Sequence, residues 1–315
     1  MRNTSNLGLA TALGLVALAT AMSPAPAAAQ QQDFSKVEIK AEHVAGKVYM
    51  LTGSGGNIGV SVGEDGILIV DDQYAPLADK IRAALKGLGE GKLKFVLNTH
   101  WHGDHTGGNE SFGAEAPILA QTNVRKRMAI EQHVLGNTVP ASPAKALPVV
   151  TYDQSVSIHW NGEELQAVHY PHGHTDGDSV VFFTGSNVVH MGDDFFNGMF
   201  PFVDLASGGS VQGMTENVAQ VLKRLPPGAK VIPGHGKLSD AEGLKAFHHM
   251  LVATTDVVRK EMKAGKSLDD IKKAGLPDEW KPWGAGFIDT PHWLEFVYNS
   301  LKGGAPKPAA DTKHH

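Results

Sequence analysis

The residues most able to do chemistry form a short cluster at positions 99–109, which read THWHGDHTGGN. His100 and His102 are two residues apart, so an extended backbone directs both imidazoles to one side. Gly103 allows a sharp turn, after which Asp104 and His105 present a second pair of ligands near the first. Imidazole and carboxylate together suit zinc, and also iron or manganese. The cluster therefore predicts a metal site.

Three later segments place histidine or aspartate beside glycine where a predicted strand ends. They are Pro171-His172-Gly173-His174-Thr175, His190-Met191-Gly192-Asp193 and Pro233-Gly234-His235-Gly236. Each is a weak signal alone, because a histidine after a glycine is more often an ordinary loop residue. Loops at one edge of a sheet are where sites are built. Together with the first cluster, these segments put metal-compatible side chains at four strand ends.

The elements that must position these residues follow from hydrophobic periodicity and turn residues. In the first half we expect strands at 37–39, 47–51, 58–62, 67–70 and 95–97, and a helix at 77–88 that ends at Gly89. In the second half we expect strands at 156–160, 165–169, 180–183, 188–191 and 231–232, and helices at 214–225, 241–258 and 290–301. Asn161-Gly162 predicts a hairpin turn, and Ser239 with Glu242 predicts a capping box. Strands followed by helices, twice over, predict one α/β domain with two packed sheets and outer helices.

Composition limits the chemistry that remains. The chain has 315 residues, 28 Lys+Arg, 33 Asp+Glu and no cysteine. Without cysteine it cannot be a disulfide scaffold, hold a thiolate zinc site or an Fe–S cluster, or use a cysteine nucleophile. A net charge of −5 argues against sequence-independent nucleic-acid binding, which needs a positive surplus.

The first residues are typical of a secretory signal peptide. Arg2 precedes an apolar run at 7–21, and small residues at 27–29 precede the glutamines at 30–32. We therefore expect a signal peptide at 1–29, a catalytic domain at 30–302 and a disordered tail at 303–315. The mature protein is expected to be periplasmic, free of the membrane and monomeric.

The cluster and the three later segments resemble the metallo-β-lactamase superfamily, and the resemblance covers nearly the whole mature chain. It implies an αβ/βα sandwich of two mixed sheets with outer helices and two Zn²⁺ ions, or Fe or Mn, at one edge. The ligands it implies are His100, His102 and His174 for the first ion, Asp104, His105 and His235 for the second, and Asp193 bridging them or joining the second. Asp71 matches the acid that orients a ligand histidine in this family, and Asp72 is a weaker candidate.

One departure from the family affects the substrate. The best-known secreted β-lactamases have cysteine where this chain has Asp193, and a substrate-binding lysine where it has Phe196. An aspartate at that position is typical of the broader hydrolases, including thioesterases of glyoxalase II type. The resemblance therefore supports a two-metal hydrolase more strongly than a β-lactamase.

The expected reaction is attack of a metal-bound hydroxide, oriented by Asp104, on a carbonyl carbon. β-Lactam ring opening is the leading activity because the protein is expected to be exported. Hydrolysis of a thioester or other ester is the first alternative. A periplasmic metal-binding accessory protein without turnover is an alternative of another class. The substrate is expected to be a small molecule. Phe195, Phe196 and Trp101 are candidates for an apolar wall beside the metals, but core packing is the more common role of such aromatics.

Overall fold

The structure is a computed structural model that describes Met1 and residues 33–303. Apart from Met1 and Gly303, the predicted signal peptide (1–29) and the predicted tail (303–315) lie outside the described residues. The account that follows concerns the described residues from Phe34 onward, which belong to one compact unit. Among the described residues, no helix combines the length and apolarity that crossing a membrane requires.

The first sheet has seven strands in the order β1-β2-β3-β4-β5-β6-β9. Their bounds are Lys40–Ala45, Val48–Thr52, Ile58–Gly63, Gly66–Val70, Leu93–Asn98, Ile118–Gln121 and Val150–Tyr152. β1 to β4 form an antiparallel meander, whereas β4, β5, β6 and β9 run parallel. Because parallel strands end at the same edge of a sheet, the loops after β4 and β5 meet there.

The second sheet has six strands in the order β10-β11-β12-β13-β14-β15. Their bounds are Ser155–Trp160, Glu163–His169, Ser179–Phe183, Val188–His190, Lys230–Ile232 and Ser239–Asp240. The predicted hairpin joins β10 to β11, and both of its turn residues have positive φ, 53° at Asn161 and 81° at Gly162. This is the conformation that an Asn-Gly hairpin turn requires. A separate hairpin consists of β7 (Gln132–Val134) and β8 (Asn137–Val139).

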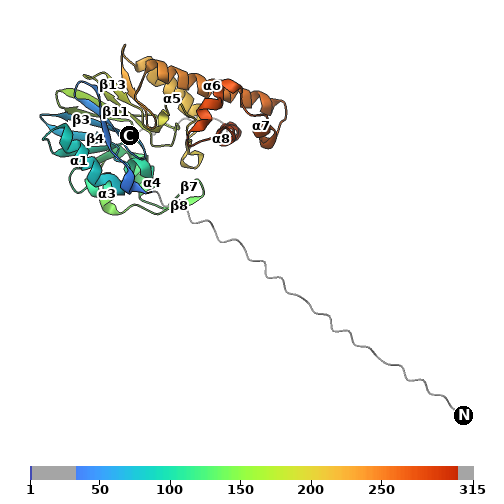
Figure 1. Cartoon of the computed structure of the whole chain (residues 1–315), viewed down its shortest axis with the longest axis horizontal. Coiled ribbons are helices and arrows are strands. Elements are labelled where there is room, and N and C mark those ends of the chain that lie inside the picture. The colour runs from blue at the N-terminus through green and yellow to red at the C-terminus, as the bar shows by residue number, and fades with distance from the viewer. Residues whose placement is uncertain (2–32, 304–315) are drawn as a thin grey trace, which may run out of the picture. The chain divides into compact units, whose positions relative to one another are not determined.

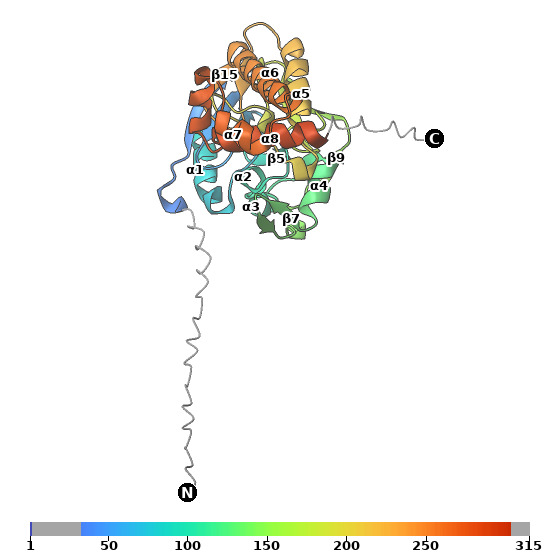
Figure 2. The same ribbon diagram turned by 90° about the vertical axis from the view of Figure 1, so that its right-hand side faces the viewer.

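Helices cover the outer faces of both sheets (Figures 1 and 2). Those in the first half are α1 (Ala78–Leu88), α2 (Gly103–Thr106), α3 (Asn109–Phe112) and α4 (Thr122–Met128). Those in the second half are α5 (Val211–Arg224), α6 (Ala241–Lys263), α7 (Leu268–Ala274) and α8 (Thr290–Gly303). Short 3₁₀ turns occupy Phe34–Lys36, Ala75–Leu77, Ala144–Ala146, Gly192–Asp194, Leu205–Ser207 and Asp278–Ala285.

Three apolar clusters account for the layering. One lies between the sheets and joins Leu68 and Leu97 of the first sheet to Val181 and Phe183 of the second. Another packs α1 onto the outer face of the first sheet. The largest packs α5, α6 and α8 onto the outer face of the second sheet. The αβ/βα sandwich expected from the sequence is therefore confirmed.

Local expectations fail in three places. Residues 37–39 are not a strand, because β1 begins at Lys40. Asp240, rather than Ser239, caps α6, since its carboxylate accepts hydrogen bonds from the amides of Glu242 and Gly243. β6, β9, the β7–β8 hairpin, α4 and α7 were not predicted from the sequence.

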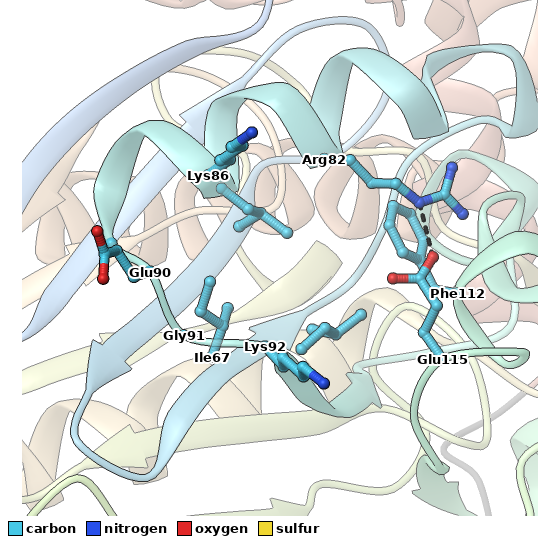
Figure 3. A pocket seen from close by; sticks show the side chains of 11 residues that line it. Ile67, Arg82, Lys86, Glu90, Gly91, Lys92, Phe112 and Glu115 are labelled. Atoms are coloured by element: carbon cyan, nitrogen blue, oxygen red, sulfur yellow. Dashed lines mark hydrogen bonds and ion pairs between the residues drawn. The ribbon is translucent and has the colours of Figure 1, made fainter.

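A pocket of about 830 Å³ lies beside α1, where β4 and β5 begin (Figure 3). Ile67 and Leu93, from the first residues of these strands, contribute to its apolar wall. Arg82 and Glu115 form an ion pair at its side, with Nε and Oε1 2.6 Å apart. The histidine cluster follows the other end of β5, so this pocket lies at the opposite end of the strands from the histidines.

Candidate metal centre

Seven predicted ligands converge where strands of both sheets end. Their donor atoms form three groups, each with atoms within 4.8 Å of one another: His100, His102 and His174; His100, His105 and Asp193; and Asp104, His105 and His235. We refer to the first of these as the histidine group and to the last as the mixed group. The structure thus brings together side chains that are separated by up to 135 positions in the chain.

Neighbouring parallel strands position the cluster at 99–109. His100 and His102 follow β5, and the short helix α2 then turns the chain so that Asp104 and His105 come back toward them. Asp71 follows β4 directly, and its amide donates to Leu97 O of β5. Its carboxylate accepts hydrogen bonds from Thr99 N at 2.7 Å and from Thr99 Oγ1 at 2.8 Å. Asp71 therefore fixes the start of the cluster.

In the histidine group, hydrogen bonds determine which ring nitrogens carry protons. His174 Nδ1 donates to the carbonyl of Phe202 at 2.8 Å, which leaves a lone pair on Nε2. His102 Nε2 donates to the carboxylate of Asp204 at 3.0 Å, which leaves a lone pair on Nδ1. These two unprotonated nitrogens lie 2.7 Å apart. Nε2 of His100 is buried beside them without a hydrogen-bond partner.

The mixed group has the same organisation. His105 Nδ1 donates to Asp71 at 2.7 Å, so Nε2 is the nitrogen that faces the group. That atom lies 3.0 Å from Asp193 Oδ1, 3.4 Å from His235 Nε2 and 3.7 Å from Asp104 Oδ2. Gly56 makes room for the ring, because a Cβ there would lie 2.0 Å from His105 Cε1.

Asp193 lies between the two groups. Its Oδ2 is 3.4 Å from Nε2 of both His174 and His235, and 3.9 Å from Nε2 of His100. The side chain is 5% exposed. It can therefore contribute an oxygen to either group or to both.

The donor set fits divalent cations. Buried lone pairs that face one another repel, and an unpartnered buried nitrogen is unfavourable, unless a cation lies between the donors. Histidines whose second nitrogen donates to a carboxylate or carbonyl are the usual form of metal-ligating histidine. The histidine group, the mixed group and Asp193 are thus the side chains that would hold metal.

Burial lowers the pKa values of His100 and His174 in the histidine group, whereas neighbouring carboxylates raise that of His235 in the mixed group. Burial, together with the neighbouring His105, lowers the pKa of His100 well below its usual value, and burial lowers that of His174 to about 4. These rings are therefore neutral, the form that binds metal. Burial opposes the charge of His235, but Asp193 and Asp104 outweigh it and raise its pKa to about 9. Burial likewise opposes ionisation of Asp104, but His105 and His235 lower its pKa to about 2.

Only the mixed group reaches solvent to a substantial degree. The side chains of Asp104 and His235 are 23% and 24% exposed, whereas those of His100 and His174 are 1% or less. Substrate must therefore approach from the side of Asp104 and His235. Tyr74 lies near this side: burial first, then the charges of Asp104 and Asp193, raises its pKa to about 12.

The three aromatic candidates occupy different positions. Phe196 stacks on His235, with ring centroids 5.0 Å apart and planes 19° apart. Phe195 is fully buried and packs against Phe247 of α6. Trp101 is buried in a small cluster with residues of β6 and α4. The structure therefore puts Phe196 beside the metal ligands, and Phe195 in the core.

Sequence reasoning missed Asp204, which holds His102 in its ligand tautomer. Asp204 also accepts from Ser207 N at 3.0 Å, and its own amide donates to the carbonyl of His174. No motif marks it, because it lies in an irregular segment remote from the cluster. Two neighbouring carboxylates have other partners: Asp194, next to the ligand Asp193, accepts from His174 N, and Asp72, the weaker candidate for the orienting acid, accepts from Gly108 N.

Comparison with known proteins agrees with this geometry. The sequence profile of the metallo-beta-lactamase superfamily matches residues 51–235, which is more than half of the chain. The chain belongs to the metallo-β-lactamase superfamily. The match runs from β2 to His235 and so includes all seven predicted ligands.

Relatives within the superfamily are distant. The chain is 29% identical over 152 residues to a hydroxyacylglutathione hydrolase of Pelagibacter ubique, covering 45% of this chain and 52% of that protein. It is 26% identical over 227 residues to the lactamase-like protein nscB of Arthroderma benhamiae, covering 68% and 47%. The chain thus spans about half the length of the curated relatives it matches.

Solved structures share the fold. The DIM-1 metallo-beta-lactamase superimposes with a TM-score of 0.56 at 19% identity, covering 69% of this chain and 99% of that chain. The sec-alkyl sulfatase PisA1 superimposes with a TM-score of 0.64 at 16% identity, covering 88% and 52%.

Proposed function

We propose that this protein is an exported hydrolase with two divalent metal ions, preferably zinc, that cleaves the acyl bond of a small thioester, ester or β-lactam. The observation that carries the proposal is the convergence of the histidine group, the mixed group and Asp193, with unprotonated ring nitrogens directed at one another. Divalent cations bound there lower the pKa of a coordinated water and polarise a carbonyl oxygen.

The side chains divide the remaining work. His100, His102 and His174 form the buried floor and keep their tautomers through fixed acceptors. Asp104, ionised and partly exposed, accepts a hydrogen bond from the attacking water and orients it. Since Asp104 and His235 lie on the open side, the scissile bond is brought to that side and the leaving group departs through it.

An acyl thioester or ester is the first substrate class to test. Phe196 is 4% exposed and stacks on one face of His235, so it holds that ring in place at the open side of the site. A relative named as a hydroxyacylglutathione hydrolase supports this choice. β-Lactam ring opening is the second candidate. It is supported by the predicted export, since β-lactams act outside the cytoplasmic membrane.

The test uses the purified mature chain, with metal analysis and a three-substrate panel: an acyl-glutathione thioester, a p-nitrophenyl ester and a chromogenic cephalosporin. We expect two bound divalent ions per chain, turnover of at least one substrate, and loss of that activity in a chelator followed by recovery with zinc or manganese. Full turnover by metal-free protein would contradict the mechanism. A metal-loaded protein that is silent on all three substrates would favour a binding role without catalysis.

Export rests on the sequence pattern of residues 1–29 and has its own test. Expression with the native N-terminus, followed by periplasmic extraction and N-terminal sequencing, is expected to give a mature chain that begins at Gln30. Recovery of the intact chain from the cytoplasm would contradict it. Gel filtration of the same sample tests the expected monomer.

A further inference from the structure

The loop that carries His174 is held from the other half of the molecule. Asp176 lies two residues after His174, in the connection from β11 to β12 of the second sheet. Its two carboxylate oxygens accept hydrogen bonds from Nε and Nη2 of Arg127, both at 2.7 Å. Arg127 belongs to α4, which directly follows β6 of the first sheet. Such a two-point contact between a guanidinium and a carboxylate fixes orientation as well as distance.

Backbone contacts around this ion pair bring the same two segments together. Asn123 Nδ2 at the start of α4 donates to the carbonyl of Asp176 at 3.0 Å. Gly177 lies so close to α4 that a Cβ there would be 3.2 Å from Val124 N. The amide of Asp176 donates to the carbonyl of Ser207 at 2.9 Å. The His174 loop therefore rests on α4 on one side and on the segment after Asp204 on the other.

Charge adds to this arrangement. The hydrogen bonds from Arg127 to Asp176 raise the pKa of Arg127 despite partial burial, and the nearby carboxylates of Asp204 and Asp178 raise it further. Asp204 holds His102, and Asp178 caps the His174 loop by accepting from Thr175 N at 2.8 Å. Arg127 thus faces three carboxylates that lie behind two histidines of the histidine group.

We infer that Arg127 is a positioning residue for the metal centre: it clamps the His174 loop through Asp176 and balances the negative charge behind His102 and His174. The inference rests on the proposed metal centre. Arg127 contacts none of the seven ligands in its hydrogen bonds and so acts through Asp176. A loose His174 loop costs affinity for metal, because three donors must then be ordered at the moment of binding.

The experiment compares zinc affinity and stability of the metal-free protein in three variants of the mature chain. Arg127→Met removes the guanidinium but keeps much of the apolar stem. Arg127→Lys keeps the charge but cannot make the two-point contact. Arg82→Met is the matched control, because it breaks another partly exposed arginine ion pair, the one with Glu115 beside the pocket in Figure 3.

Zinc affinity is measured by competition with a chromophoric chelator. We expect Arg127→Met to weaken binding about 10–100-fold, the usual effect of losing a partner behind a metal ligand. We expect Arg127→Lys to recover part of this loss and Arg82→Met to bind zinc as the wild type does. Arg127 also forms hydrogen bonds with Gln132, the first residue of β7, so its replacement can lower the stability of the fold as well as the affinity for zinc. The melting temperature of the metal-free protein measures this loss of stability separately.

A second variant keeps the test informative if Arg127→Met does not fold. Asp176→Asn preserves shape and one acceptor, and it is expected to weaken zinc binding without further loss in the double variant with Arg127→Met. Wild-type zinc affinity in both Arg127→Met and Asp176→Asn would overturn this inference and leave the proposed function intact. The same would follow if Arg82→Met lost as much zinc affinity as Arg127→Met. A wild-type chain that binds no zinc would overturn the proposed function and this inference with it.

Discussion

The substitution Asp71→Asn tests whether Asp71 orients a metal ligand in addition to stabilising the fold. Asp71 is fully buried and has φ 67°, a left-handed conformation that asparagine also tolerates. It accepts three hydrogen bonds, one from His105 and two from Thr99. An asparagine keeps the acceptor that faces Thr99 N but puts an NH₂ group where the other oxygen accepts from His105 Nδ1. Two donors then face each other.

Burial opposes the charge of His105, but Asp193, Asp104 and Asp71 outweigh it and raise its pKa, so both ring nitrogens carry protons in the metal-free protein. Facing the amide of the variant, the ring is relieved by losing the proton on Nδ1 and keeping the one on Nε2, the atom that faces Asp193 and the mixed group. A protonated Nε2 cannot ligate. We therefore expect zinc affinity to fall about 10–100-fold, or roughly 1.4–2.8 kcal/mol at 1.4 kcal/mol per tenfold change. The free energy of unfolding of the metal-free protein should fall by about 1.5–3 kcal/mol, the value of one hydrogen bond to a charged group.

Zinc affinity is measured by chelator competition, and stability by denaturant unfolding of metal-free protein. Asp72→Asn is the matched control. Asp72 is equally buried, and its carboxylate accepts from Gly108 N. Its hydrogen bond to a ligand residue runs from its backbone amide to the carbonyl of His105, which the substitution leaves in place. Burial and the charge of Asp71 raise its pKa, so asparagine closely imitates its neutral form. An Asp71→Asn protein that binds zinc as tightly as Asp72→Asn would refute the tautomer argument.

Three further predictions follow from the same contacts. Asp204→Asn replaces the acceptor of His102 while Ser207 N keeps a partner, so zinc affinity should fall about tenfold with little change in the metal-free melting temperature; an unchanged affinity would show that the pair is not needed. Gly56→Ala puts a methyl group into the ring of His105, so one metal should be lost in metal analysis, and full loading would contradict this packing. Because the pKa of His235 in the metal-free protein is about 9, the ring is protonated at pH 7 and must release its proton to bind. Zinc affinity should therefore rise from pH 7 to 9, and calorimetry in buffers of different ionisation enthalpy should detect proton release. A flat pH profile would contradict this.

The sequence predicted the ligands of the site better than the residues that orient them. Spacing marks the ligands: His100, His102 and Asp104 must sit close together because they are joined by a short glycine-containing turn. Asp204 carries no such mark, because its role depends on an irregular segment returning to His102 from 102 positions away. Arg127 and Asp176 could not be predicted for the same reason. Arginine and aspartate are common surface residues, and these two meet only when the two sheets pack together.

Elements were predicted where periodicity was strong and missed where the segment was short. The repeated apolar positions of α1, α5 and α6 are long enough to read. β9 has three residues, two of them exposed, so its sequence carries no alternating pattern. Ser239 and Asp240 are both good capping residues, and both pair with β14, so neither residue type nor sheet pairing shows which of them caps α6.

Both sheets contribute ligands, and this ties metal binding to the packing of the sandwich. His100, His102, Asp104 and His105 follow β5 of the first sheet, whereas His174, Asp193 and His235 follow β11, β13 and β14 of the second. Bound cations would therefore cross-link the two halves at one edge, in addition to hydrogen bonds that already join the halves there, such as those from Ser179 N to Thr99 O and from Asn57 N to Gly234 O. The Arg127–Asp176 pair acts between the same halves without metal, so it and the metal centre should stabilise the same closed arrangement. The stabilisation by the ion pair and the stabilisation by bound metal are then coupled, because either one orders the two halves and so reduces the conformational entropy lost when the other forms.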